Sequence, residues 1–193
     1  MQIRKAMFQK EQHDFLSGIV EMDEVYIGGK PRKGKKYDSD DDKPKRGRGT
    51  TKAPVIGIVE RKENGKVSAK AVAKDKLKGK NLRAFVREKV NVAKSKLMTD
   101  EYKGYSGMSR LLPHEVIKHA FSYVDGDIHT NTIESFWALL KRGMFGQFHS
   151  VSRRHLQKYV DEFCYRYNNR GNANAFGLTI YRALGVRHAG EFA

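Results

Sequence analysis

The sequence predicts an α/β fold, because segments with strand character come before and between segments with helical spacing. Residues 15–27 are rich in β-forming side chains, and the run is closed by Gly28-Gly29. Residues 54–60 and 67–73 have the pattern of two further strands. Asn64-Gly65 lies between them, and this pair tolerates the positive φ angles of a tight hairpin turn. We therefore expect three consecutive strands, the last two of them a hairpin.

The remaining segments follow a second regular order. Residues 81–92 carry apolar side chains three to four apart, which predicts a helix. Short strands are expected at 96–100, ending on a carboxylate, and at 114–119. Further helices are predicted at 131–143, 152–168 and 176–184. Strands with a hairpin, a helix, two strands and then helices is the order of a ribonuclease-H-like mixed sheet flanked by helices, with a helical C-terminal tail. Pattern alone leaves other α/β layouts open.

Three regions of the chain follow from this order. Residues 15–150 are expected to form the ribonuclease-H-like domain, and residues 151–193 a helical extension packed on it. Residues 1–14 are polar and look like a helix end or linker. The segment 30–52 is rich in Lys, Arg and Gly and is predicted to be a loop, and its acidic patch at 38–42 has the character of a solvated segment.

Charge is the strongest global signal in the 193 residues. Thirty-eight Lys and Arg against 22 Asp and Glu give a net charge of +16, which favours a polyanionic partner such as DNA. Charge alone does not distinguish an enzyme from a binding protein. The single cysteine, Cys164, excludes an internal disulfide and a cysteine-based zinc site. Since neither a signal peptide nor a long apolar run is visible, we expect a soluble cytoplasmic protein.

Three carboxylates occupy positions that suit phosphoryl-transfer chemistry with two metal ions. Asp23 lies inside an apolar strand, Asp100 ends a strand, and Glu134 opens an aromatic-rich amphipathic helix. Mg²⁺ prefers such hard oxygen ligands. Each acid also has a simpler explanation: an exposed edge position, a turn residue, and an acid favoured by the helix dipole, respectively.

Pattern does not choose among the acids in these segments. Glu21 has the same strand parity as Asp23, while Glu24 and Glu101 adjoin the proposed ligands. Lys141 follows Glu134 by seven residues, close to the roughly 7.2 residues of two helical turns. The two side chains are therefore expected on one helix face, about 10 Å apart along the axis. The alternative for this lysine is an ordinary exposed side chain.

Three ordered motifs resemble the DDE-type transposases of bacterial insertion sequences. They are Val-Glu-Met-Asp-Glu-Val-Tyr-Ile-Gly-Gly-Lys (20–30), Thr-Asp-Glu-Tyr-Lys-Gly-Tyr (99–105) and His-Thr-Asn-Thr-Ile-Glu-Ser-Phe-Trp-Ala-Leu-Leu-Lys-Arg-Gly (129–143). The resemblance covers roughly residues 17–170. The most similar branch carries a zinc ribbon and a helix-turn-helix ahead of its catalytic domain. Here the zinc-ribbon cysteines are absent, and residues 1–7 look like the tail of a helix-turn-helix, so we expect a truncated copy or an isolated catalytic domain.

The resemblance implies particular roles for individual residues. The family's metal ligands match Asp23, Asp100 and Glu134, which would hold two Mg²⁺ ions, with Mn²⁺ as a possible substitute. Lys141, with its neighbour Arg142, would bind transposon-end DNA. The residues that precede the glutamate, His129 and Asn131, would orient phosphate or metal-bound water, or else cap the helix.

The function implied is that of a DNA transposase catalytic domain, which cleaves at transposon ends and transfers strands into target DNA. Resemblance also implies a homodimer or higher assembly on DNA, and a nucleoid-associated location in a bacterial cytoplasm. The alternative is a non-catalytic DNA-binding fragment that regulates a transposase. A weaker alternative is a ribonuclease-H-like nuclease that cuts without joining.

Overall fold

A computed structural model describes residues 2–8, 15–28, 50, 52–117, 129–149 and 151–184. The strands are β1 (Leu16–Ile27), β2 (Ala53–Glu60), β3 (Val67–Ala71), β4 (Val90–Thr99) and β5 (His114–Val116). The α-helices are α1 (Gln2–Met7), α2 (Gly79–Lys89), α3 (Asn131–Arg142), α4 (Arg153–Asn168) and α5 (Ala175–Ala183). None of these helices is long and apolar enough to cross a membrane. Most of the predicted 30–52 loop, with its acidic patch, lies outside the described residues.

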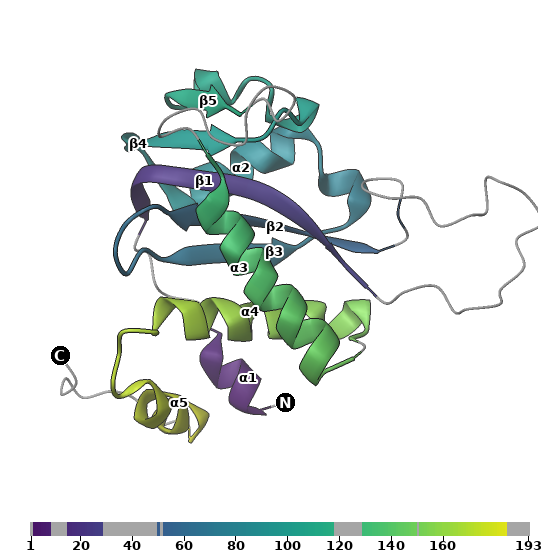
Figure 1. Ribbon diagram of the computed structural model, residues 1–193, viewed down its shortest axis with the longest axis vertical. Coiled ribbons are helices and arrows are strands. Elements are labelled where there is room, and N and C mark those ends of the chain that lie inside the picture. Colours follow the sequence, from purple (N-terminus) through teal and green to yellow (C-terminus); the bar gives the residue numbers. More distant parts are fainter. Residues whose placement is uncertain are drawn as a thin grey trace, which may run out of the picture.

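The strands form one five-stranded mixed sheet in the order β3-β2-β1-β4-β5 (Figure 1). β1 pairs antiparallel with β2, and β2 antiparallel with β3. β4 runs parallel to β1, and β5 parallel to β4. The predicted ribonuclease-H-like mixed sheet is confirmed, and its first three strands are antiparallel.

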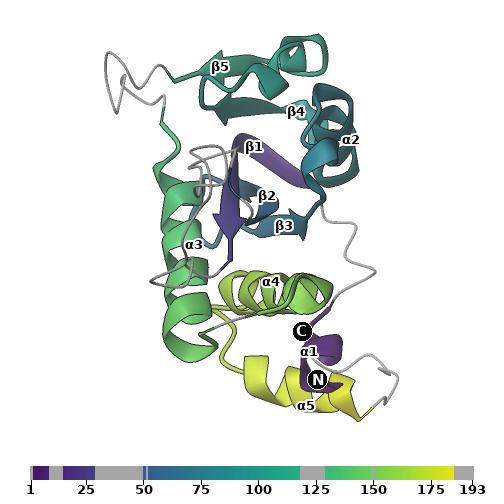
Figure 2. The same cartoon turned by 90° about the vertical axis from the view of Figure 1, so that its right-hand side faces the viewer.

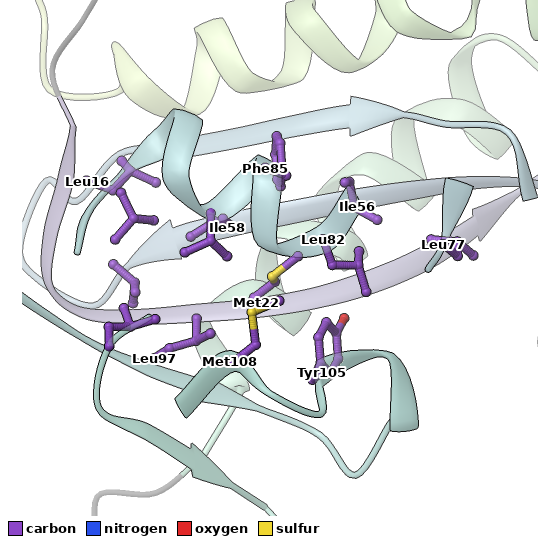
Figure 3. Close-up of a cluster of buried hydrophobic side chains, with 14 residues drawn as sticks. Leu16, Met22, Ile56, Ile58, Leu77, Leu82, Phe85, Leu97, Tyr105 and Met108 are labelled. Atoms are coloured by element: carbon purple, nitrogen blue, oxygen red, sulfur yellow. The ribbon is translucent and has the colours of Figure 1, made fainter. Parts of the chain in front are cut away.

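Alternating side chains along β1 and β2 divide the core between the two faces of the sheet. On one face, Met22 and Ile58 pack with Leu82 and Phe85 of α2 (Figure 3). On the other face, apolar side chains of α3 and α4 pack on β2 and β3; they include Ile133, Phe136, Trp137, Leu140, Leu156 and Val160. Figure 2 shows α2 and α3 on opposite sides of the sheet. Both faces of the sheet are therefore covered by helices.

The predicted hairpin turn at Asn64-Gly65 joins β2 and β3. Asn64 has a φ of 54°, and the backbone N–H of Glu60 donates to the carbonyl of Lys66 at 2.9 Å. A β-carbon at Gly65 would collide with the carbonyl oxygen of Glu60. This position therefore requires glycine for the return of the chain into β3.

The boundary between the second helix and the fourth strand differs from the prediction. We expected a helix to residue 92 and a strand from 96, but α2 ends at Lys89 and β4 begins at Val90. The central residues of β4, 93 and 94, are exposed, and its pairing with β1 shifts register near Gly18. An exposed, irregular strand centre lacks the apolar alternation that marks a strand in sequence.

Residues 2–7 form a helix that is anchored to the C-terminal helices. The Nε–H of Arg4 donates to a carboxylate oxygen of Glu162, a buried α4 residue, at 2.6 Å. The same guanidinium lies over the ring of Tyr159, 4.1 Å from its centroid. In Figure 1, α1 lies beside α4 and α5, beyond the β3 edge of the sheet.

Side chains of α4 satisfy the open edge of β3. The Gln157 amide accepts from the backbone N–H of Ala71 at 2.7 Å and donates to the carbonyl of Ala69 at 3.3 Å. The Asn168 amide accepts from the N–H of Val67 at 2.7 Å and donates to its carbonyl at 3.0 Å. Edge strands left unpaired are templates for association with other chains. These two amides therefore supply hydrogen bonds that a sixth strand would otherwise make to β3.

Replacing both amides, in Gln157→Ala/Asn168→Ala, is expected to destabilise the fold and promote self-association. Four hydrogen bonds at about 1 kcal/mol each are lost, and buried backbone groups are left unpaired. Urea unfolding and light scattering measure the two effects, with the exposed amide change Gln147→Ala as the control. A double variant as stable and as monodisperse as the control would show that α4 does not protect this edge.

Candidate active site

Asp23 projects from the middle of β1 toward α3. Its neighbours of the same parity, Val25 and Ile27, belong to the core cluster that includes α3. One carboxylate oxygen accepts from the backbone N–H of Glu24 at 2.7 Å, and the other from the indole N–H of Trp137 at 3.1 Å. The carboxylate is thus held between its own strand and the helix that covers it.

Asp100 immediately follows β4 on the strand next to β1. The parallel register pairs Val20 with Leu97 and Glu21 with Met98, so its continuation sets Asp23 opposite Asp100. Neighbouring strands lie about 4.8 Å apart, so the two carboxylates lie side by side on adjacent strands. An oxygen of Asp100 accepts from the backbone N–H of Tyr102 at 3.0 Å, and this bond orients the side chain.

Glu134 and Lys141 both belong to α3. Glu134 lies in its first turn, exposed, where one carboxylate oxygen accepts from the hydroxyl of Thr130 at 2.9 Å. Lys141 lies in the last turn and is also exposed. Both side chains line the same cleft. The seven-residue spacing thus places them on one face of the helix.

A glycine lets α3 approach the sheet closely. Gly57 of β2 pairs directly with Asp23 of β1. A β-carbon at Gly57 would lie 2.6 Å from the Trp137 ring and 3.3 Å from Ile133. The absence of a side chain at this position therefore lets Trp137 reach Asp23.

These residues form a cleft of about 450 Å³ between the sheet and α3. Its lining includes four carboxylates and one lysine: Asp23, Glu24, Asp100, Glu134 and Lys141. This local excess of negative charge stands in a chain whose net charge is +16.

Three of the four acids of the cleft have no cationic partner within the described part of the chain. Among the described residues, Asp23, Asp100 and Glu134 take part in no ion pair. Burial, and then the neighbouring Glu24 carboxylate, raises the pKa of Asp23 from 3.8 to about 7. Asp100 contributes to the same rise. A cation in the cleft would relieve this repulsion.

The donor set fits a hard divalent cation, since all of the acids offer carboxylate oxygens. Within the described part of the chain, no three His, Cys, Asp or Glu side chains are gathered closely enough to enclose one ion. The Glu134 carboxylate is instead engaged with Thr130, at the start of its own helix. The chemistry of the ligands therefore suits Mg²⁺, and the site as it stands is open between β1 and α3.

The structure separates the acids that the sequence pattern left equivalent. Glu21 is fully buried and bonded to Arg61 and to α3, away from the cleft lining. Glu24 reaches the cleft but accepts from the buried hydroxyl of Tyr105 at 2.8 Å. Burial, and then Glu24, raises the pKa of Tyr105 well above its usual value, so this hydroxyl remains a donor. Glu101 is exposed and does not line the cleft.

The remaining candidate residues lie around α3 but outside the cleft lining. The His129 ring lies against Glu21, with Nδ1 at 3.4 Å from the carboxylate, and accepts weakly from the backbone N–H of Asn131. Asn131 and Arg142 are exposed at the two ends of the helix. Sequence reasoning gave no role to Trp137 or Arg61, because their partners come from distant segments.

The fold and this cleft define a class of protein: a ribonuclease-H-like domain with carboxylates gathered between its central strands and the helix that covers them. The family of ISXO2-like transposase domains matches residues 15–168, and the chain belongs to this family. The predicted relation to insertion-sequence transposases is thereby confirmed. No curated protein matches the chain.

Among solved structures, the chain is similar to one in the cryo-EM structure of a simian T-cell lymphotropic virus intasome in complex with PP2A regulatory subunit B56 gamma. The identity is 11% and the TM-score 0.44. The match covers 96% of this chain and 53% of that one, so the present chain spans about half of that chain's length.

Replacing Asp23 by Asn is expected to stabilise the metal-free protein at neutral pH. Because the pKa of this carboxyl is raised from 3.8 to about 7, the folded state binds its proton more tightly than the unfolded state. The free energy of unfolding therefore falls as pH rises through this interval, by at most about 4 kcal/mol, and the loss is complete above pH 7. Asp23→Asn removes this loss.

Thermal unfolding in EDTA at pH 5 and pH 8 measures the effect. The advantage of Asp23→Asn over the wild type should be larger at pH 8, while the exposed change Asp75→Asn should give no such trend. An advantage that does not grow with pH would contradict the raised pKa of Asp23.

Proposed function

We propose that this chain is the catalytic domain of a DNA transposase that cleaves at transposon ends and transfers the cut strand into target DNA. One observation carries the proposal. Asp23 of β1, Asp100 after β4 and Glu134 of α3 come from separate segments and line one cleft, together with Lys141. Membership of a transposase family supports the same activity.

The proposed reaction has two steps at phosphodiester bonds. Water first attacks the phosphorus at the transposon end, and the bond to a 3′ oxygen breaks, which leaves a free 3′-hydroxyl. That hydroxyl then attacks a phosphorus in target DNA and displaces a 3′ oxygen there. The number of phosphodiester bonds is conserved in the second step, so it needs no external energy source.

In this proposal Asp23, Asp100 and Glu134 hold Mg²⁺, with two ions expected and Mn²⁺ as a substitute. The bound ions would stabilise negative charge on the reacting phosphate oxygens. Asp23 must be ionised to serve as a ligand, and its raised pKa shows that it holds a proton tightly when no cation is near. Glu134 must exchange its bond with Thr130 for the ion.

The basic residues supply affinity for the DNA backbone. Lys141 lies about 10 Å along α3 from Glu134, so it is placed to contact a backbone phosphate near the one at the proposed metal site. Arg142 is exposed beside it and can extend this contact. His129 and Asn131 lie at the start of α3, outside the cleft lining, and are proposed to orient phosphate there or to cap the helix. As in other strand-transfer systems, we expect two or more such domains to act together on DNA.

Replacing any one of the three carboxylates is expected to abolish cleavage and strand transfer. The variants are Asp23→Asn, Asp100→Asn and Glu134→Gln, which remove charge with little change of shape. Loss of one metal ligand should lower the rate by at least about 100-fold, while DNA binding persists, because affinity comes mainly from Lys and Arg. Labelled transposon-end oligonucleotides with Mg²⁺ or Mn²⁺ report both steps, and filter binding reports affinity.

The matched control is Glu101→Gln, which removes the exposed acid next to Asp100. It should leave the products unchanged. Full activity in any of the three ligand variants would refute the assignment of that residue. Salt-sensitive DNA binding without products in the wild type, in the presence of either metal, would favour the non-catalytic regulatory role instead.

A further inference from the structure

A carboxylate that the proposed reaction does not use is buried beside the cleft. Glu21 of β1 is 0% exposed and lies two residues before Asp23, on the same face of the strand. A buried carboxylate is costly unless charged and hydrogen-bonding partners surround it. Its partners all come from the end of β2 and the start of α3.

Glu21 caps α3 from the neighbouring sheet. One oxygen accepts from the backbone N–H of Ile133 at 2.9 Å, and the other from the hydroxyl of Thr132 at 2.9 Å. The residue that precedes the helix, Thr130, makes no capping bond with its side chain and donates to Glu134 instead. The role that a local Ser, Thr or Asp usually plays is therefore filled by a β1 carboxylate. Negative charge is also favourable at this end of a helix.

Arg61 connects Glu21 to the segment that enters α3. Its Nε–H donates to Glu21 at 2.8 Å, and an Nη2–H donates to the backbone carbonyl of His129 at 2.7 Å. Arg61 directly follows β2, where its backbone N–H also donates to the carbonyl of Ile19 at 2.8 Å. The guanidinium thus ties the two central strands to the chain that enters α3, and neutralises the buried carboxylate.

We propose that Glu21 and Arg61 are a positioning pair that sets the separation between Asp23 and Glu134. This inference rests on the proposed function. Glu21 is two residues from Asp23, and the groups it binds on α3 are one and two residues from Glu134. Both ligands are therefore fixed to the same buried carboxylate. Displacement of the helix start would move Glu134, and with it Trp137, away from β1.

The chain contains a reporter of this placement. Trp137 is its single tryptophan, is 3% exposed, and donates to Asp23. Its fluorescence therefore reports the contact between α3 and β1 without any need for activity. Metal titration and turnover report the consequence for the proposed site.

The test compares Glu21→Gln with the matched control Glu60→Gln. Glu60 is also a buried carboxylate, 3% exposed, but it accepts from the backbone N–H groups of Ser17 and Lys66 and from the Lys62 amine, none of which belongs to α3. Both changes remove one buried charge. Arg61→Lys is the second variant, since an amine keeps the charge but lacks the fork that joins Glu21 to the His129 carbonyl.

In folded protein, Glu21→Gln and Arg61→Lys are expected to increase acrylamide quenching of Trp137. They should weaken the apparent Mn²⁺ affinity about 10-fold or more, as outer-shell changes at metal sites do. Glu60→Gln should lower the melting temperature yet keep wild-type quenching and Mn²⁺ affinity. If Glu21→Gln and Arg61→Lys both keep wild-type quenching, Mn²⁺ affinity and turnover, the positioning role is overturned. If the wild type neither binds Mn²⁺ nor cuts DNA, the proposed function fails, while the quenching comparison still decides whether the pair places α3.

Discussion

The distance between α3 and the sheet is the constraint on which the site depends. Gly57 leaves room for Trp137 and Ile133 directly over the central strands. Glu21 binds the start of the same helix from β1. Close packing in the middle and hydrogen bonds to a buried carboxylate at the start fix the helix at two points. The positions of Glu134 and Lys141 along the cleft depend on this contact, since both side chains are exposed and project from the same helix.

The same arrangement concentrates negative charge in the cleft. The cleft gathers four carboxylates against one lysine, in a chain with 38 Lys and Arg against 22 Asp and Glu. Such a cluster destabilises the fold unless it is protonated or neutralised, and burial, then the neighbouring Glu24 carboxylate, raises the pKa of Asp23 to about 7. Groups with strongly shifted pKa values tend to gather where a protein does chemistry. A net charge of +16 favours a polyanionic partner, and an acidic cleft favours cations; phosphodiester chemistry with metal ions uses both.

The elements that rest on local patterns could be predicted from sequence. The hairpin followed from Asn64-Gly65, and α3 from its apolar spacing, because turn chemistry and helical periodicity are properties of a few neighbouring residues. The first half of β4 was missed because its centre is exposed and its pairing with β1 is irregular. Within this half of β4 only Val90 is paired with β1, before the register shifts near Gly18.

The site was predictable in outline only. Strand parity put Glu21 and Asp23 on one face, but parity does not tell a capping carboxylate from a cleft carboxylate. The two acids differ in their partners: Glu21 binds Arg61, 40 residues away in sequence, and the Ile133 N–H, 112 residues away. The resemblance to transposases selected Asp23, and the geometry supplies a physical reason, since Glu21 is already fully engaged.

Whether Asp23, Asp100 and Glu134 bind metal is a separate question, and crystals grown with Mn²⁺ answer it most directly through anomalous scattering. We expect anomalous peaks in the cleft, about 2–2.5 Å from carboxylate oxygens of these three residues. Ordered carboxylates at saturating Mn²⁺ with no peak between them would contradict it.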